Sequence, residues 1–463
     1  MAMNSLEAQT QQALLNRTKH WRFGHKAGLD FNMTTGVPTV FNGSNGITYE
    51  GNSCISDTLG NLLFYCTGDT VWNRNHVMML NGAGMKSDKI TILNSCIIPR
   101  PGNPNQYYLF VNECVNNNCS GGKLYSSLID MTLDGGNGAL VLSEKNKVIM
   151  MQAYNNMAFT KHANNIDYWL SYSEALAPYN FCMIKITSSG ADTTNRVISG
   201  YQGIVFNRFS PDSKIFASEY KVYQFNNSTG NLSNEIALPS DSVGTFLPFS
   251  MEFSSNSKIL YYGLIYTGAF YPNLFQQFDL STYTQTAIAS SIYNFYDSYP
   301  NTSYRGLGHL QLAANGKIYV ARTGGFIDTL HVIHNPNASG AACNFEYNAI
   351  GLNNKACNFS LPIFPDYYFN NIPLLTSTNE VNFSSDKNNL VFPNPCDDWL
   401  TINHKITDNY TYTLINQLGS VVNTYSGNQL QSKLNVIHLT NGIYYLNIKS
   451  INSSVTKKII INH

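Results

Sequence analysis

The sequence predicts an all-β protein, built as a seven-bladed β-propeller followed by a small immunoglobulin-like β-sandwich. Aromatic residues make up 13% of the chain, with 30 Tyr and 25 Phe, and such side chains suit pleated sheets. A strand–turn–strand phrase recurs through the body of the chain. The segment 390–463 alternates apolar and polar residues at period two, with Pro, Asn and Gly at the turns. Together these patterns favour two all-β parts.

The first segment, residues 1–20, is interpreted as an N-terminal extension or as the remnant of a truncated signal. A short helix is expected over 5–19, with Ser5 as the candidate N-cap. Residues 1–12 lack the apolar middle region of a secretory signal. The sequence therefore leaves the native N-terminus open.

The predicted propeller covers residues 21–370 and contains six copies of the recurring phrase. A clear copy has an apolar strand end, a polar turn with Asp or Asn, a Lys and a second apolar strand. The copies recur at intervals of about 43 to 61 residues, which suits a four-stranded propeller blade. The clear copies are 209–216, 253–260 and 312–319, and the looser ones are 55–65, 98–110 and 159–170.

The seventh blade is expected to combine 345–368 with the opening strand 21–24. Such a blade would join the two ends of the ring and leave no sheet edge exposed. Propellers of six or eight blades are the alternatives. A β-helix fits less well, because its repeats are shorter and more regular.

A polar segment, residues 371–389, separates the body from the tail. It mixes Ser, Thr and Asn and shows no strand period after Leu375, so we interpret it as an exposed linker. The tail, residues 390–463, has the short alternating strands of a small β-sandwich.

Composition excludes several classes of partner. Charged residues are only 12% of the chain and sum to a formal net charge of zero. The chain therefore lacks the basic surface expected of a protein that binds nucleic acid or an anionic membrane. No run of 18 apolar residues exists, so we expect no membrane span. No cofactor or metal motif is found, and we expect neither group.

Nine cysteines favour an oxidising compartment. They show no Cys-x-x-Cys pair and no zinc-type spacing with His. The alternative is that the cysteines are buried thiols that pack as small apolar residues. Three disulfides are expected as candidates: Cys54 with Cys66, Cys114 with Cys119, and Cys343 with Cys357.

Catalytic motifs are absent from the sequence, so any active site would have to be assembled from distant residues near the ring axis. Four histidines could gather there: His25, His76, His162 and His309. Six acids lie near predicted strand ends: Glu50, Glu113, Glu174, Glu219, Glu252 and Asp297. A glycosidase would need two such acids roughly 5 to 9 Å apart. Structural roles are favoured for these residues, and enzyme activity is left open.

A dense aromatic region between two repeats is the candidate binding loop, because it forms a long insertion over 270–305. Exposed aromatic rings stack on sugars or anchor protein partners. The alternative is that these rings pack between blades. The candidate ligand-binding residues are Tyr271, Tyr293, Tyr296, Tyr299 and Tyr304.

The tail resembles the C-terminal sorting domain of the type IX secretion pathway of Bacteroidetes, which is an export address. The residues that carry this resemblance are Pro393, Asn394, Pro395, Gly419, Gly442, Tyr444 and Lys457. The body is similar to secreted Bacteroidetes propeller proteins through the motifs at 21–24, 335–337, 343–345 and 361–364. This resemblance implies export by the type IX machinery and a place outside the cell or on the outer-membrane surface.

These observations predict a secreted or surface-attached propeller that binds a glycan or a surface protein. One alternative is an extracellular hydrolase or lyase with its site at the propeller axis. The other is a structural component of the cell surface or of the gliding machinery. Whether the tail is cleaved after export is not set by the sequence.

Overall fold

The computed structural model describes two compact units, 1–375 and 376–463. The described residues are 5–49, 51–87, 95–113, 122–154, 157–203, 206–239, 246–266, 274–296, 307–322, 326–372, 389–404, 407–416, 421–450 and 454–463. Most of the predicted linker lies outside these ranges. The positions of the predicted domain boundaries therefore stay a prediction.

The first unit opens with a helix and a small sheet. Helix α1 (Ser5–Asn16) confirms the helix expected near the N-terminus. The sheet that follows has the order β1 (His20–Phe23), β2 (Ala27–Phe31) and β3 (Pro38–Val40). Trp21 and Phe31 of this sheet are almost fully buried, and their ring centroids are 5.1 Å apart.

The next two sheets are joined into one of nine strands, because β11 pairs with β7 in parallel at Ala139 and Leu80. The first contains β4 (Asn52–Ser56), β5 (Leu62–Thr67), β6 (Thr70–Asn73) and β7 (Met78–Ala83). The second contains β8 (Ser95–Pro99), β9 (Gln106–Asn112), β10 (Gly122–Asp130), β11 (Ala139–Leu140) and β12 (Lys147–Ala153). Short 3-10 turns lie at η1 (Asp134–Gly136) and η2 (Leu142–Glu144).

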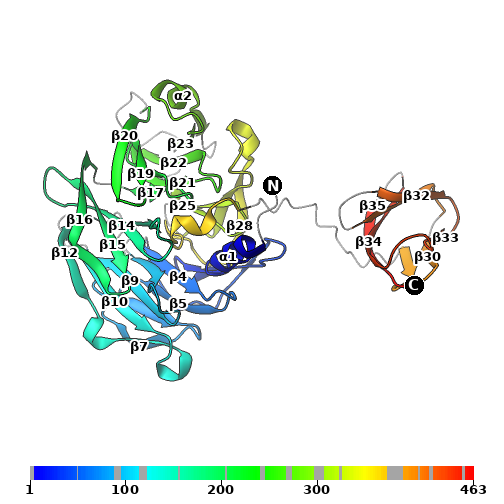
Figure 1. The fold of residues 1–463 in the computed structure, drawn as a ribbon, viewed down its shortest axis with the longest axis horizontal. Coiled ribbons are helices and arrows are strands. Elements are labelled where there is room, and N and C mark those ends of the chain that lie inside the picture. The colour runs from blue at the N-terminus through cyan, green and yellow to red at the C-terminus, as the bar shows by residue number, and fades with distance from the viewer. Residues whose placement is uncertain are drawn as a thin grey trace. The chain divides into compact units, whose positions relative to one another are not determined.

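Four antiparallel sheets of four strands each complete the body (Figure 1). The first contains β13 (Ala158–Lys161), β14 (Tyr168–Ser173), β15 (Asn180–Thr187) and β16 (Gly190–Gln202). The second contains β17 (Asn207–Phe209), β18 (Ile215–Ser218), β19 (Lys221–Asn226) and β20 (Asn231–Ala237). The third contains β21 (Phe246–Phe253), β22 (Ile259–Tyr266), β23 (Leu274–Asp279) and β24 (Tyr293–Tyr296), with helix α2 (Gln285–Ser290) before β24. The fourth contains β25 (Leu307–Leu312), β26 (Ile318–Arg322), β27 (Thr329–Ile333) and β28 (Phe345–Gly351), with η3 (Gly340–Cys343) before β28.

The recurring phrase builds the turn between the first two strands of a sheet. In the copy at 209–216, the Ser210 hydroxyl accepts from Ile215 N at 2.9 Å and donates to Asp212 at 2.6 Å. In the copy at 253–260, Ser254 accepts from Ile259 N at the same distance of 2.9 Å. A side chain that satisfies turn amides in this way fixes the turn locally. This local chemistry explains why the repeat is visible in the sequence.

The body is a β-propeller, because successive antiparallel sheets stand around a common centre with their first strands innermost (Figure 1). Neighbouring first strands contact one another, as β1 does β4, β4 does β8, β13 does β17, β17 does β21, and β21 does β25. The ends of the body meet at His25, whose backbone bridges to Ile47 and to Ala356. The count of seven blades stays a prediction.

The predicted make-up of the seventh blade is wrong. The opening strand 21–24 belongs to the sheet β1–β3, while Phe345–Gly351 forms β28 and pairs with β27 as the outer strand of the preceding sheet. The reason is that three short strands, β1 to β3, follow one another within 20–40 and form a sheet of their own. This sheet includes no strand from the other end of the body. Closure instead occurs through the bridge at His25.

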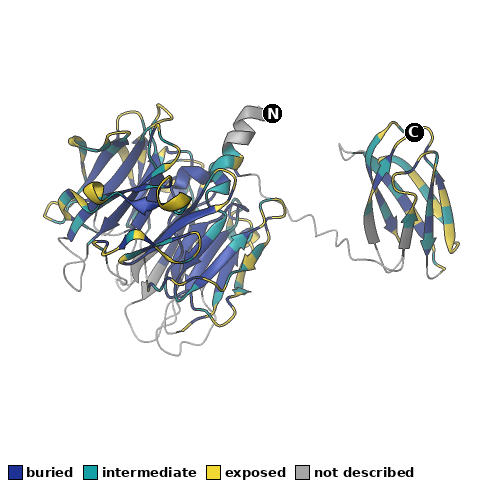
Figure 2. Ribbon diagram, turned by 90° about the horizontal axis from the view of Figure 1, so that it is seen from below, coloured by how far each residue is buried: buried dark blue, intermediate teal, exposed yellow. Residues whose placement is uncertain are grey.

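The second unit is a sandwich of two sheets. One has the order β29 (Asn389–Phe392), β30 (Trp399–His404), β33 (Gln431–Asn435). The other has the order β32 (Val421–Gly427), β31 (Tyr410–Asn416), β34 (Gly442–Lys449), β35 (Ser454–Ile461). Its own core includes Leu400, Tyr412 and Leu446, all fully buried. Each unit therefore has a separate hydrophobic core, which Figure 2 shows as buried strand interiors.

Candidate functional site

The centre of the propeller is occupied by the chain itself. The segment after β28 carries the 3-10 turn η4 (Asp366–Phe369), which contacts α1, β13 and β17. On one side, Ile363 N donates to Asn52 O at 3.1 Å, and on the other, Asn371 N donates to Ser255 O at 2.7 Å. These bonds tie the segment to β4 and to the turn that follows β21. We call residues 360–372 the axis segment.

A buried charge cluster holds the axis segment to the first strands of three sheets. Arg208 of β17 contacts Asp366 at 3.0 Å and Glu252 of β21 at 3.2 Å. Arg208 also donates to Gln311 Oε1 of β25 at 3.1 Å and to the Leu310 carbonyl at 3.3 Å. Only 1% of Glu252 and of Asp366 is exposed. A buried guanidinium of this kind needs its donors engaged, and β21, β25 and η4 supply the partners.

Backbone amides complete the cluster. Phe209 N donates to Asp366 Oδ2 at 3.1 Å, while Phe253 N and Leu312 N donate to the two oxygens of Glu252 at 2.9 and 3.0 Å. Burial raises the pKa of Asp366 to about 8, against the attraction of Arg208. Burial raises the pKa of Glu252 as well. The neighbouring Glu252 raises the pKa of Asp366 further, so burial and the second acid both favour the protonated form while Arg208 opposes it.

The shifted acids alone would suit a general acid–base site, but both carboxyl groups are almost fully buried. Beside Arg208 and His309 the described residues leave a cavity of about 10 Å³, roughly the space of one water. His309 is 2% exposed, and burial lowers its pKa to about 3. The cluster is therefore a structural clamp between the axis segment and the ring.

The other predicted histidines do not join this cluster. His76 lies against Phe41, with ring centroids 4.8 Å apart, and His162 stacks on Trp169 at 5.4 Å. His25 forms the backbone bridge that links the ends of the body. Of the acids chosen from the sequence that the structure describes, Glu252 is the one in the central cluster, and Glu50 and Asp297 lie outside the described residues.

The predicted aromatic binding loop is described only in part. Tyr271, Tyr299 and Tyr304 lie outside the described residues, and Tyr296 is described only as the last backbone position of β24. Tyr293 lies on β24, an outer strand, and is 38% exposed. Its ring packs edge to face on Phe295 at 4.8 Å. A ligand-binding role for these residues stays a prediction.

Two hollows open between neighbouring sheets. One, of about 570 Å³, lies against β18–β20 and the segment after β23, and the other, of about 500 Å³, lies against β9–β12 and the hairpin of β15 and β16. We call them the first and the second hollow. Their sizes are those of ligand-binding clefts.

The disulfide expectation is wrong for the cysteines that the structure describes, because all seven are free and buried. Cys54 lies opposite Tyr65, and Cys66 lies opposite Ser53, so the two thiols point to opposite faces of the hairpin. A bulge between Ile55 and Ser56 shifts the register by one residue from the symmetric hairpin that the sequence suggested. Cys343 and Cys357 are likewise free, and Cys114 and Cys119 lie outside the described residues.

Asn394, one of the predicted sorting residues, is hydrogen-bonded to the last strand of the tail. The Asn394 side chain donates to Lys458 O and accepts from Ile460 N, both at 2.8 Å. It thereby fastens the Pro393–Pro395 turn to β35. Tyr444 is 6% exposed, and its hydroxyl donates to Thr440 O at 2.9 Å.

The remaining sorting residues have simpler places. Gly442 begins β34 and pairs with Ile461, and Lys457 of β35 pairs with Leu446. Gly419 lies outside the described residues.

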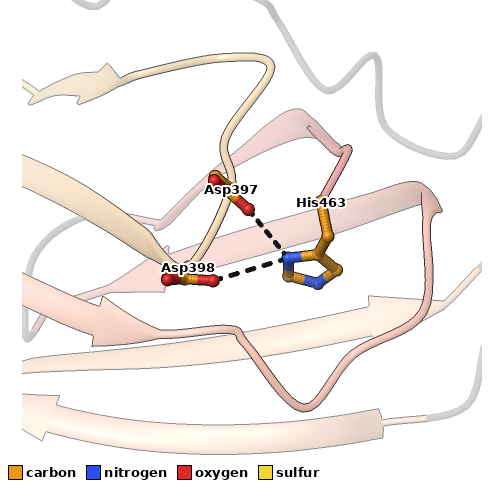
Figure 3. Close-up of side chains that lie close together, drawn as sticks. All are labelled: Asp397, Asp398 and His463. Atoms are coloured by element: carbon orange, nitrogen blue, oxygen red, sulfur yellow. Dashed lines mark hydrogen bonds and ion pairs between the residues drawn. The ribbon is translucent and has the colours of Figure 1, made fainter.

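Three side chains of the tail, Asp397, Asp398 and His463, meet at the surface (Figure 3). His463 Nδ1 is 3.1 Å from Asp397 and 3.7 Å from Asp398, and Nε2 is 2.8 Å from the Leu439 carbonyl. Both ring nitrogens thus face oxygen acceptors, which favours the doubly protonated ring, and the pKa of His463 is raised by these bonds. In that form neither nitrogen has a lone pair for a metal.

The sequence of the tail identifies the class of this protein. Residues 390–462 match the family of secretion system C-terminal sorting domains. The chain is therefore an exported β-propeller protein, sent through the type IX secretion system to the cell surface or the extracellular space. The sorting domain implies contact with the secretion machinery, and no described helix is long and apolar enough to cross a membrane.

Several solved structures match much of the chain at low identity. PorZ, an essential surface component of the type IX secretion system of Porphyromonas gingivalis, is 9% identical, with a TM-score of 0.33, over 95% of this chain and 68% of that one. The extracellular domain of BT4673, a putative hybrid two-component system from B. thetaiotaomicron, is 13% identical, with a TM-score of 0.40, over 96% and 56%. A putative 6-phosphogluconolactonase from Bacteroides fragilis is 12% identical, with a TM-score of 0.42, over 74% and 97%. The propeller assignment depends on the sheet topology of this chain, since every TM-score is below 0.5. No curated protein matches the sequence.

Arg208 and Asp366 are the central residues that sequence reasoning missed. Asp366 stands in Ile-Phe-Pro-Asp-Tyr-Tyr-Phe, where an acid among apolar residues is buried and needs a partner. That signal was available. Its partner was not predictable, because Arg208 is 158 residues away in the chain.

Proposed function

We propose that the propeller is a binding protein, displayed at the cell surface or released outside the cell, whose ligand is a glycan or a surface protein. The observation that carries this proposal is the filled axis. Arg208, Glu252 and Asp366 close the place where many propeller sites would open, with room for about one water beside them. Among the described residues, the outer surface and the two hollows between sheets offer room for a ligand.

A hydrolase or lyase at the axis fits this geometry less well. The central acids have raised pKa values, as a general acid would, yet both are 1% exposed and bonded to backbone amides. A substrate would have to displace the axis segment before it reached them. No contact within the described residues favours a purely structural role over binding.

The purified full chain tests this proposal directly. It is incubated with insoluble polysaccharides and with a panel of immobilised extracellular proteins, and both retention and soluble products are measured. Retention without release of sugar or peptide products supports the proposal. Product release from any of these materials, or retention on none of them, overturns it.

A further inference from the structure

The first hollow is floored by one face of the sheet β17–β20. Ile215 of β18 lies opposite Gln224 of β19, which lies opposite Ser233 of β20. Residues directly opposite on neighbouring strands present their side chains to the same face. Gln224 and Ser233 are exposed, so the floor is a row of polar groups beside one aliphatic residue.

The wall of this hollow comes from the next sheet and is fixed to the floor. The Tyr283 hydroxyl donates to Asn234 O of β20 at 3.1 Å. The Gln285 amide donates to Ala237 O at 2.7 Å and accepts from Ala237 N at 3.2 Å. Three hydrogen bonds therefore hold wall and floor together without a ligand. A preformed cleft loses less conformational freedom when a ligand binds.

Several polar groups of the first hollow remain available. Within the described part of the chain, the Lys214 ammonium, the Asn227 side-chain amide and the Ser233 hydroxyl have no hydrogen-bond partner. These groups can exchange water for ligand hydroxyls at little cost.

The second hollow differs in this respect. Arg100 donates to Ser188 O at 2.8 Å and to Gln106 at 2.6 Å, and the Tyr108 hydroxyl donates to Ser188 O at 3.1 Å. Lys147 and Glu144 lie 3.8 Å apart as an ion pair. Its charged groups are thus already engaged within the protein, although its volume is similar.

The chemistry of the first hollow indicates its ligand. One acid, Asp212, and one base, Lys214, line it, so its formal charge is zero. Planar side-chain amides and a hydroxyl can form hydrogen bonds with neighbouring hydroxyl groups of a sugar. The Tyr283 ring offers an apolar surface beside them. We propose that the first hollow binds a neutral oligosaccharide. This inference deepens the proposed binding function and rests on it.

The test uses the full chain and an array of neutral and acidic oligosaccharides, followed by titration calorimetry with the best neutral binder. Two changes are made in the first hollow: the pair Lys214→Ala with Asn227→Ala, and Ser233→Trp, which fills the floor. These residues have exposed or partly exposed side chains that hold no element in place, so folding should persist. Thr193→Trp in the second hollow is the matched control.

We expect each first-hollow variant to weaken binding at least tenfold and the control to leave the affinity unchanged. Glycan binding that all variants retain overturns the site but keeps the binding function. Capture of a surface protein without any glycan also overturns the inference and keeps that function. Binding to neither overturns both, and a preference for acidic glycans overturns the assigned ligand class.

Discussion

Arg208 and Asp366 lie 158 residues apart in the chain, yet the guanidinium and the carboxylate meet at 3.0 Å in the centre of the propeller. The contact joins the first strand of one sheet to a segment that follows the last sheet. The propeller is thereby held together by a contact at its axis as well as by the contacts between neighbouring sheets. Tertiary contacts of such long sequence separation close the fold late and stabilise it as a whole.

The pH dependence of stability follows from the raised pKa values of the central acids. An acid whose pKa is higher in the folded state than in the unfolded state is more fully protonated in the folded protein. Its contribution to stability is therefore fully present below the pKa of the unfolded state and is lost as the pH rises through the pKa of the folded state. For Asp366 the window extends from its ordinary value of 3.8 to about 8. We expect the urea midpoint of the body to fall between pH 5 and pH 8.5.

Asp366→Asn should weaken this pH dependence, because the amide does not titrate, and Asp328→Asn, a change of an exposed side chain, should leave it intact. The comparison is made by urea unfolding at several pH values. A wild-type body whose stability rises steadily over this window would refute the assignment.

The Asn394 side chain should be the principal tie between the Pro393–Pro395 turn and β35. Asn394→Ala removes two hydrogen bonds and leaves Ile460 N without its partner, a loss of about 1–3 kcal/mol. We expect faster amide hydrogen exchange in β35 of the full chain. Asn409→Ala, whose side chain is exposed, is the control and should exchange at the wild-type rate. Equal rates in both variants would show that the turn is held by other contacts.

The described cysteines should be thiols and not disulfides. Burial raises the pKa of Cys54 and of Cys66 to about 12, which keeps both protonated and slow to react in the folded protein. Alkylation followed by mass spectrometry should show little labelling of either residue under native conditions and full labelling in denaturant without reductant. A Cys54–Cys66 cross-link in the unreduced protein would contradict the observed register.

The imidazole of His463 should titrate above its ordinary range, because Leu439 O and Asp397 favour the protonated ring. A raised value means that the contact with Asp397 is complete at low pH and is lost as the pH rises through the shifted pKa. The NMR shift of the ring proton follows this directly. Asp397→Asn should lower the midpoint, while Asp408→Asn, on a distant loop of the same unit, should not. A midpoint at or below the ordinary value of 6.5 would disprove the ion pair.

Local chemistry made much of the fold predictable. The turns after Phe209, Phe253 and Leu312 were recognisable because Asp or Asn and then Lys recur at fixed places. In the first two turns the structure shows that Ser210 and Ser254 hold the turn amides. The tail was recognisable for a similar reason, since its strands are short and punctuated.

Long-range and register-dependent features were not predictable. A single bulge near Ile55 placed Cys54 and Cys66 on opposite faces, and no composition signal marks such a bulge. Pairing of Arg208 with Asp366 depends on the closure of the whole ring. Glu252 was selected only as one acid among six.

The central claim is that the chain closes its own axis through the Arg208–Asp366 pair, and a double-mutant cycle of urea unfolding tests it most directly. Arg208→Met and Asp366→Leu, each alone, should lower the free energy of unfolding by about 3–5 kcal/mol, because each breaks a buried, hydrogen-bonded contact of the central cluster. The double variant should lose at least about 1 kcal/mol less than the sum of the two, since the contact between the two side chains can be lost only once. Losses that add to within about 0.3–0.5 kcal/mol would contradict the claim.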